Sequence, residues 1–275
     1  MQHKRIISIT ILIIAAIAAV SVLVCLFFVN QSRVSQARNR LVRYRTVYKG
    51  RPYDKTALVY LPRGYQDSSK KYNVLFLMHG WGMSENDFIK GDPNDKAPVI
   101  DDLMKDEKNP FIVVSPTYYP NRSFTNDDEA SEDKLTKRFA KTEINQVLKV
   151  VQAQYHVYKS RNHYAFAGFS FGAITGWAVM QDQLSHFRYF QMIAGGDNRA
   201  AQLRSKLLKS KLAYDVTVSV GSDDYVNNGT PYDIDRTMNT LKNVPHIRFH
   251  IDENGSHDLP SAMRQLKFGM RFFFK

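Results

Sequence analysis

The apolar positions of this chain fall into short runs separated by longer stretches of mixed character. Runs typical of β-strands lie at 43–49, 55–61, 73–79, 111–115, 164–169, 189–194, 215–220 and 247–251. Between most of the later runs, apolar residues recur at helical spacing, most clearly over 134–155, which contains neither Gly nor Pro. This alternation predicts an α/β fold, in which a mostly parallel sheet is covered by helices on both faces.

A different pattern opens the chain. Residues 6–29 carry no charge and are mostly apolar, and a helix of that length can cross a bilayer. A cleavable secretory signal usually has a shorter apolar region, so the segment predicts an uncleaved signal-anchor within residues 1–29. Residues 30–42 are polar and arginine-rich and predict a juxtamembrane stalk, followed by one folded domain at 43–275.

Charge and cysteine content refine this picture. The formal net charge of +12 favours contact with anionic lipids or wall polymers, and no motif supports nucleic-acid binding. The single cysteine, Cys25, lies in the apolar segment, so the folded domain holds no disulfide. Val24 before it is too large for the usual lipoprotein pattern, which favours a membrane-buried apolar thiol. No histidine or cysteine spacing indicates a metal, and no cofactor is expected.

The most informative motif follows the strand predicted at 164–169. Gly168-Phe169-Ser170-Phe171-Gly172 is a G-x-S-x-G sequence between a strand and a helical pattern, the context of a nucleophile elbow. On such a turn the Ser170 hydroxyl projects beyond the sheet edge. Trp177, on the following helix, is expected in the core and not in a substrate site.

Partners for this serine come after later strands. The strand at 215–220 ends in Gly221-Ser222-Asp223-Asp224, and the strand at 247–251 leads into His257. The order Ser170, Asp224, His257 is that of an α/β-hydrolase triad. Asp223 competes with Asp224 as the acid, and we favour Asp224 because it is the fourth residue of the G-x-x-D turn.

Upstream, the strand at 73–79 runs into His79-Gly80-Trp81-Gly82. The backbone N–H groups of Trp81 and Phe171 are expected to form an oxyanion hole, while His79 shapes the turn. A long segment at 116–133 interrupts the strand–helix alternation. Tyr118, Tyr119 and Phe124 in it are candidates for a substrate pocket, with a solvated acidic insertion as the alternative.

Five segments in this order, YLPRGY, LFLMHGWGMSENDF, AFAGFSFGA, VGSDD and NGSHD, resemble the esterase D and feruloyl-esterase group, carbohydrate esterase family one. The resemblance spans roughly residues 43 to 275 and implies an α/β-hydrolase fold with Ser170, Asp224 and His257 as catalytic triad. Two departures are Phe171, where Met is frequent after the serine, and Gly172-Ala173, where two glycines are common.

The resulting prediction is a membrane-anchored serine esterase that forms an acyl-enzyme. The resemblance implies feruloyl or acetyl esters of polysaccharides as substrates. A small-acyl carboxylesterase, acyl transfer to a wall or lipid alcohol, and a non-catalytic surface binding protein remain alternatives. The catalytic domain is expected outside the cytoplasm, although more arginines follow the apolar segment than basic residues precede it, which by the positive-inside rule favours the opposite orientation.

Overall fold

The computed structural model describes residues 17–22, 24, 38–66, 69–91, 97–120, 129–224 and 234–275. By its internal contacts the chain divides into two units, residues 1–39 and 40–275. In the first unit residues 17–22 are helical. Most of the predicted anchor, 6–29, lies outside the described residues, and none of the described helices is both long and apolar enough to cross a membrane.

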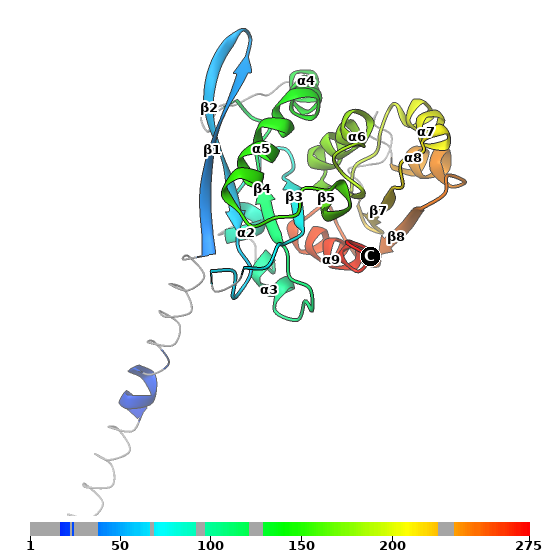
Figure 1. The fold of residues 1–275 in the computed structure, drawn as a ribbon. Coiled ribbons are helices and arrows are strands. Elements are labelled where there is room, and N and C mark those ends of the chain that lie inside the picture. Colours follow the sequence, from blue (N-terminus) through cyan, green and yellow to red (C-terminus); the bar gives the residue numbers. More distant parts are fainter. Residues whose placement is uncertain are drawn as a thin grey trace, which may run out of the picture. The chain divides into compact units, whose positions relative to one another are not determined.

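The strands of the described part of the chain form one eight-stranded sheet, in the order β1-β2-β4-β3-β5-β6-β7-β8 (Figure 1). Their bounds are β1 Asn39–Tyr48, β2 Arg51–Tyr60, β3 Val74–Met78, β4 Ile112–Ser115, β5 Tyr164–Phe169, β6 Tyr189–Ile193, β7 Asp215–Gly221 and β8 Ile247–Asp252. β2 pairs with β4 antiparallel, whereas all pairings from β4 to β8 are parallel. The predicted α/β fold with a mostly parallel sheet is confirmed, with β1 beginning four residues earlier than expected.

Helices cover both faces of this sheet (Figure 1). The side chains of β3 alternate between two buried clusters: Val74, Phe76 and Met78 belong to one, Leu75 and Leu77 to the other. α5, α6, α7 and α8 complete the first cluster and α2, α3 and α9 the second. These helices are α2 Asp87–Lys90, α3 Ile100–Met104, α5 Ile144–Gln154, α6 Phe171–Gln183, α7 Ala200–Lys209, α8 Ile234–Leu241 and α9 Leu259–Met270.

The helix predicted over 134–155 is present but not uniform. It consists of α4 (Glu129–Arg138), a π-helical turn (Phe139–Glu143) and α5. Leu135, Phe139, Ile144, Val147 and Val151 line its buried face, as the spacing predicts. The π-helical turn was not predicted, and its last residue, Glu143, is an acidic side chain in the core.

Glu143 is buried among polar groups from three elements. Its carboxylate pairs with Lys55 of β2, accepts a hydrogen bond from the Tyr44 hydroxyl of β1 at 2.7 Å, and lies 2.6 Å from Arg138 of α4. Arg138 also donates to the carbonyl of Val47 at 3.1 Å. Burial lowers the pKa of Lys55 from its usual value, while the adjacent Glu143 carboxylate acts in the opposite direction. This cluster joins the β1–β2 hairpin to the helix layer.

We predict that Glu143→Gln lowers the free energy of unfolding by about 3–5 kcal/mol, because it leaves the buried Lys55 and the partly buried Arg138 without their shared carboxylate. Lys55→Met is expected to lose less, since Arg138 still compensates Glu143. Urea unfolding of the two variants and the parent chain measures both losses. Equal losses in the two variants would contradict the assignment of Glu143 as the common partner.

Candidate active site

The chain turns sharply at Ser170, between β5 and α6. Ser170 has φ 56° and ψ −119°, a conformation that costs a non-glycine residue of order 1–3 kcal/mol. Its backbone N–H donates to the carbonyl of Ile193 at 2.8 Å, and its own carbonyl accepts from Ala173 and Ile174. The turn therefore has the geometry of the predicted nucleophile elbow and places Ser170 at the amino end of α6.

Glycines make this turn possible by allowing close backbone contact. A Cβ on Gly168 would overlap the carbonyl of Gly172, and a Cβ on Gly172 would overlap the carbonyl of Met78 at the end of β3. A Cβ on Gly195 would lie 2.6 Å from the Ser170 carbonyl oxygen. Backbone from β3, β5 and the segment after β6 therefore surrounds the serine at distances that no side chain permits.

The structure brings the three predicted triad residues into one hydrogen-bonded chain. His257 Nε2 lies 3.0 Å from Ser170 Oγ, and His257 Nδ1 lies 2.8 Å from Asp224 Oδ2. Asp224 is 5% exposed, whereas Asp223 is exposed and its carboxylate accepts a hydrogen bond from Ser222. Of the two adjacent acids, Asp224 is the one in contact with the histidine.

Backbone contacts hold the Asp224 turn and the His257 loop together. A Cβ on Gly221 would overlap the carbonyl of Gly255, and the N–H of Asp223 donates to that same carbonyl at 2.9 Å. At the end of β8, Asp252 accepts hydrogen bonds from Ser261 and Arg264 of α9. The acid and the base are thus fixed to each other by their own loops, independently of their side-chain hydrogen bond.

The loop after β3 lies directly beside the serine. A Cβ on Gly80 would sit 3.3 Å from the Ser170 Cβ. The Gly80 carbonyl accepts from His79 Nδ1 at 2.8 Å and from the N–H of Met83 at 3.3 Å, closing a turn in which Gly82 has φ +71°. Because C=O and N–H of a trans peptide point in opposite directions, the Trp81 N–H is turned away from the buried His79 ring.

His79 has a single tautomer consistent with these contacts. A carbonyl only accepts, so Nδ1 carries the proton, and Nε2 accepts from the Thr117 hydroxyl at 2.8 Å. The ring is fully buried, and burial lowers its pKa to about 4. At neutral pH His79 is therefore uncharged, and its two hydrogen bonds connect the loop after β3 to the segment after β4.

The predicted pocket residues have different environments. Tyr118 is 0% exposed, so its ring is part of the core and does not line a surface pocket. Tyr119 is half-buried, stacks on His79 with ring centroids 5.5 Å apart, and its hydroxyl accepts from the Gly82 N–H at 3.0 Å. Phe124 lies outside the described residues.

The rings of Trp81 and Phe171 are neighbours on the two segments that meet at the serine. Trp81 is 52% exposed, and its ring centroid lies 6.1 Å from that of Phe171, the residue after Ser170. Trp177 is 1% exposed and donates from Nε1 to the Gly195 carbonyl at 2.9 Å, so it lies in the core as predicted. Trp81 thus places a half-exposed indole on the loop whose Gly80 contacts Ser170.

Thr117 and the hydroxyl of Tyr119 support the loop after β3, and neither role was predicted from the sequence. Their position in the sequence indicates this role only weakly. Both residues follow β4, which pairs with β3 in parallel, so the carboxyl ends of the two strands lie at the same sheet edge.

We predict that His79 makes the fold less stable in acid. Between pH 6.5 and about 4 the unfolded chain binds a proton at this residue that the folded protein does not, so the free energy of unfolding falls as pH falls. The contribution is about 3 kcal/mol, at 1.36 kcal/mol per pKa unit. In urea unfolding at several pH values, His79→Gln should show a shallower loss than the parent chain over this range; parallel curves would contradict the assignment.

Comparison with known proteins places this site in a family. A family model described as "Putative esterase" matches residues 52–258. The chain is 30% identical over 227 residues to endo-1,4-beta-xylanase Y of Acetivibrio thermocellus, covering 74% of this chain and 19% of that protein. It is 30% identical over 197 residues to an endo-1,4-beta-xylanase/feruloyl esterase of Xylanibacter ruminicola, covering 68% of this chain and 24% of that protein. The chain thus spans about a fifth to a quarter of these relatives.

Solved structures agree with this match. The feruloyl esterase module from Clostridium thermocellum, a serine-to-alanine mutant complexed with sinapinate, is 25% identical with a TM-score of 0.62, covering 86% of this chain and 88% of that chain. A ferulic acid esterase of family CE1 from Anaeromyces mucronatus, 17% identical with a TM-score of 0.67 over 86% of this chain and 91% of that chain, shares the fold. The resemblance to feruloyl esterases of carbohydrate esterase family one is confirmed, and the chain belongs to the esterase family that the matching model describes.

Proposed function

We propose that this chain is a membrane-anchored serine esterase that cleaves carboxylic esters through an acyl-enzyme. The observation that carries the proposal is the hydrogen-bonded chain from Ser170 through His257 to Asp224. A serine hydroxyl alone is a weak nucleophile at neutral pH, and an adjacent imidazole that a carboxylate orients is the arrangement that activates it.

In the proposed first step, Ser170 Oγ attacks the ester carbonyl carbon while His257 Nε2 takes its proton. Asp224, which accepts from His257 Nδ1, stabilises the imidazolium that forms. The tetrahedral intermediate then collapses, and His257 returns the proton to the departing alcohol. Water, activated by the same imidazole, hydrolyses the acyl-enzyme and frees Ser170.

The developing oxyanion is proposed to bind the backbone N–H groups of Trp81 and Phe171. The contact of Gly80 with Ser170 and the orientation of the Gly80–Trp81 peptide support the first donor. Phe171 begins α6, so its N–H lies at the positive end of a helix dipole, which supports the second. One such donor typically lowers the activation free energy by about 2.7–4 kcal/mol.

The proposed substrates are feruloyl or acetyl esters of polysaccharides. The half-exposed Trp81 ring beside Ser170 supports an aromatic acyl group, because offset aromatic contacts add about 0.5–1.5 kcal/mol to the burial of area. The relatives support the same class by their names, which include a feruloyl esterase module complexed with sinapinate. Tyr119 borders this region through its hydrogen bond to Gly82, which retains it as a candidate substrate contact.

We predict that Ser170→Ala abolishes labelling by a fluorophosphonate probe and lowers hydrolysis of methyl ferulate and p-nitrophenyl acetate to the background rate. Two acid variants supply the matched control. Asp224→Asn should lower kcat by roughly ten-thousand-fold by removing the group that orients the imidazole, whereas Asp223→Asn should stay near the parent rate.

The outcomes of this experiment separate the alternatives. Labelling of Ser170 without net hydrolysis, together with new esters when glycerol or sugar alcohols are added, would favour acyl transfer. Turnover of acetate but not ferulate would favour a small-acyl carboxylesterase. Equal rates for the parent chain and Ser170→Ala would contradict catalysis and favour a binding protein.

Anchoring by residues 6–29 and an extracytoplasmic catalytic domain complete the proposal. The long uncharged segment supports the anchor.

We predict that the full chain sediments with membranes, resists extraction by high salt, and is released by detergent. Protease added to intact cells should digest the folded domain; protection in intact cells with digestion after lysis would reverse the orientation.

A further inference from the structure

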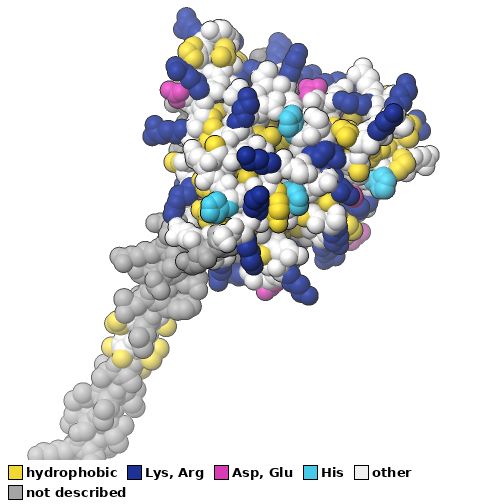
Figure 2. Space-filling model, viewed as in Figure 1, with side chains coloured by type: hydrophobic (Ala, Val, Ile, Leu, Met, Phe, Trp, Pro, Cys, Tyr) yellow, Lys and Arg dark blue, Asp and Glu magenta, His cyan; other side chains and the backbone are white. Residues whose placement is uncertain are grey.

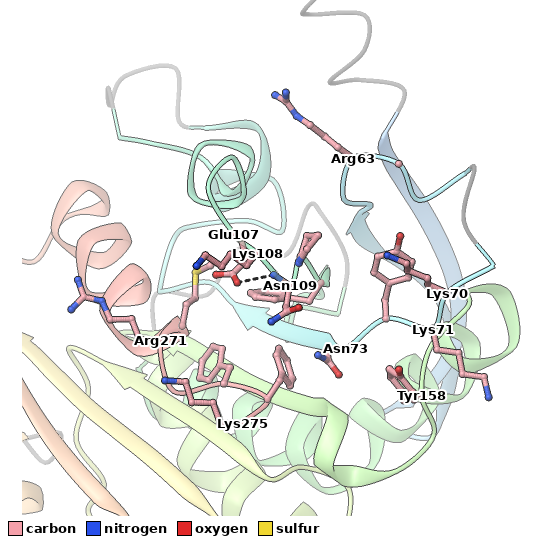
Figure 3. A pocket seen from close by; sticks show the side chains of 17 residues that line it. Arg63, Lys70, Lys71, Asn73, Glu107, Lys108, Asn109, Tyr158, Arg271 and Lys275 are labelled. Carbon is pink, nitrogen blue, oxygen red and sulfur yellow. Dashed lines mark hydrogen bonds between the residues drawn. The ribbon is translucent and has the colours of Figure 1, made fainter.

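A hollow lies at the sheet edge opposite the triad. It has a volume of about 860 Å³ (Figure 3). Asn73 and Phe111, which line it, directly precede β3 and β4, whereas Ser170, Asp224 and His257 follow the last residues of β5, β7 and β8. Because these strands are parallel, the two sites lie at opposite ends of them, separated by about 20 Å, the length of a six-residue strand.

The hollow, which we call the basic groove, is lined mainly by positively charged side chains. Lys70 and Lys71 precede β3, Lys108 precedes β4, and Arg271 and Lys275 follow α9 (Figure 3). All five are exposed. Among the described lining residues, one side chain is acidic: Glu107, whose carboxylate accepts from the N–H of Asn109 at 3.1 Å. Arg63, also in the lining, pairs with Asp101 at 3.6 Å.

The floor of the basic groove is formed by buried and half-buried aromatic rings. Tyr72, Phe111 and Phe273 line it and are buried, and the ring of Phe274 contacts Phe111 and Tyr189 at centroid distances of 5.3 and 5.5 Å. The exposed cations therefore lie around an aromatic base. Figure 2 shows that basic side chains far outnumber acidic ones on the face in view, so the groove adds to a general excess of positive charge.

The polypeptide enters the folded domain at this same edge. β1 and β2 are neighbours joined through Lys49 and Gly50, so the first residues of β1 lie opposite the end of β2. Tyr60, the last residue of β2, pairs with Val113 near the start of β4. The proposed anchor ends at residue 29, about ten residues before β1. An extended chain of ten residues reaches at most about 35 Å.

We propose that the basic groove docks on the phosphate headgroups of anionic phospholipids and holds this edge of the sheet against the membrane. Each basic residue near an anionic membrane surface contributes about 1 kcal/mol to the free energy of membrane binding. Several cations on one face therefore bind such a surface together, although a single cation binds it only weakly. Docking through this edge turns the triad edge away from the bilayer, toward esters in the surrounding medium. The contact does not depend on the hydrolytic step.

The test uses residues 39–275, because both buried clusters of the described chain lie entirely within them. We expect this domain to sediment with vesicles of phosphatidylcholine containing phosphatidylglycerol, not with phosphatidylcholine alone, and to be released by added salt. The groove variant Lys70→Gln/Lys71→Gln/Lys108→Gln/Arg271→Gln should lower the partition coefficient at least about 100-fold, from roughly four contributions of this size.

A matched control removes the same charge elsewhere. Lys141→Gln/Lys149→Gln/Arg204→Gln/Lys206→Gln changes three Lys and one Arg on the helix layer, and none of them lines the groove. It should retain most of the binding. An equal loss in both variants, or equal sedimentation with the two vesicle types, would overturn the proposal, as would binding to soluble polygalacturonate without binding to phosphatidylglycerol vesicles.

Two further readouts make the result specific. Ser170→Ala should bind vesicles like the parent domain, and the groove variant should hydrolyse p-nitrophenyl acetate at the parent rate, which separates docking from the proposed function and confirms folding. The chain has two tryptophans, Trp177 in the core and Trp81 at the triad edge. Brominated lipid should therefore leave their fluorescence unquenched in the bound state; strong quenching would show that the triad edge faces the membrane and would overturn the proposed orientation.

Discussion

Direct contact between backbone segments at the carboxyl ends of β3 and β5 is the constraint on which the site depends. Gly168 and Gly172 allow the first turn of α6 to rest on the last carbonyl of β3, and this contact holds Ser170 at φ 56°. A Cβ at either glycine would separate the elements. The loop after β3 would then no longer reach the serine, although every catalytic side chain would still be present in the chain.

The remaining parts of the site are held by polar groups that the fold buries with their partners. His79 links the loop after β3 to the segment after β4, Asp252 links the end of β8 to α9, and Glu143 links the hairpin to the helix layer. Each is located at the end of an element or at an irregular turn, where backbone hydrogen bonds are incomplete. Apolar packing builds the two layers, and these polar contacts fix their ends relative to one another.

Much of this architecture could be predicted from the sequence because its signals are local. All eight strands coincide with apolar runs, and Ser170, Asp224 and His257 follow strands whose ends parallel pairing brings together. The turn pattern favoured Asp224 over Asp223, and the contact that distinguishes the two acids in the structure, from Asp224 to His257, joins residues far apart in the chain.

Other features could not be predicted, mostly because they also depend on contacts between segments that are far apart in the chain. Tyr118 and Tyr119 are adjacent and chemically alike, yet one is in the core and the other supports the loop after β3, a difference decided by neighbours on another strand. The basic groove combines residues from segments before β3, before β4 and after α9. Apolar periodicity over 134–155 predicted a helix but carried no sign of the π-helical turn, because one extra residue barely alters the pattern of buried positions.

That turn has a consequence for how the chain tolerates changes in length. A π-helical turn contains one residue more than the α-helical geometry that it interrupts, so it corresponds to a single-residue insertion within a continuous helix. Removing one residue from Phe139–Glu143 would restore regular winding and leave α4 and α5 in nearly the same rotational register, because the wider turn already absorbs the extra residue. Winding all five residues as regular α-helix would instead rotate α4 relative to α5 by about 100°, the angle of one residue at 3.6 residues per turn, so that Arg138 and the apolar face of α5 could not both face the core. The turn is therefore a position where a single-residue deletion leaves the buried faces of α4 and α5 in place, provided that Glu143 is retained.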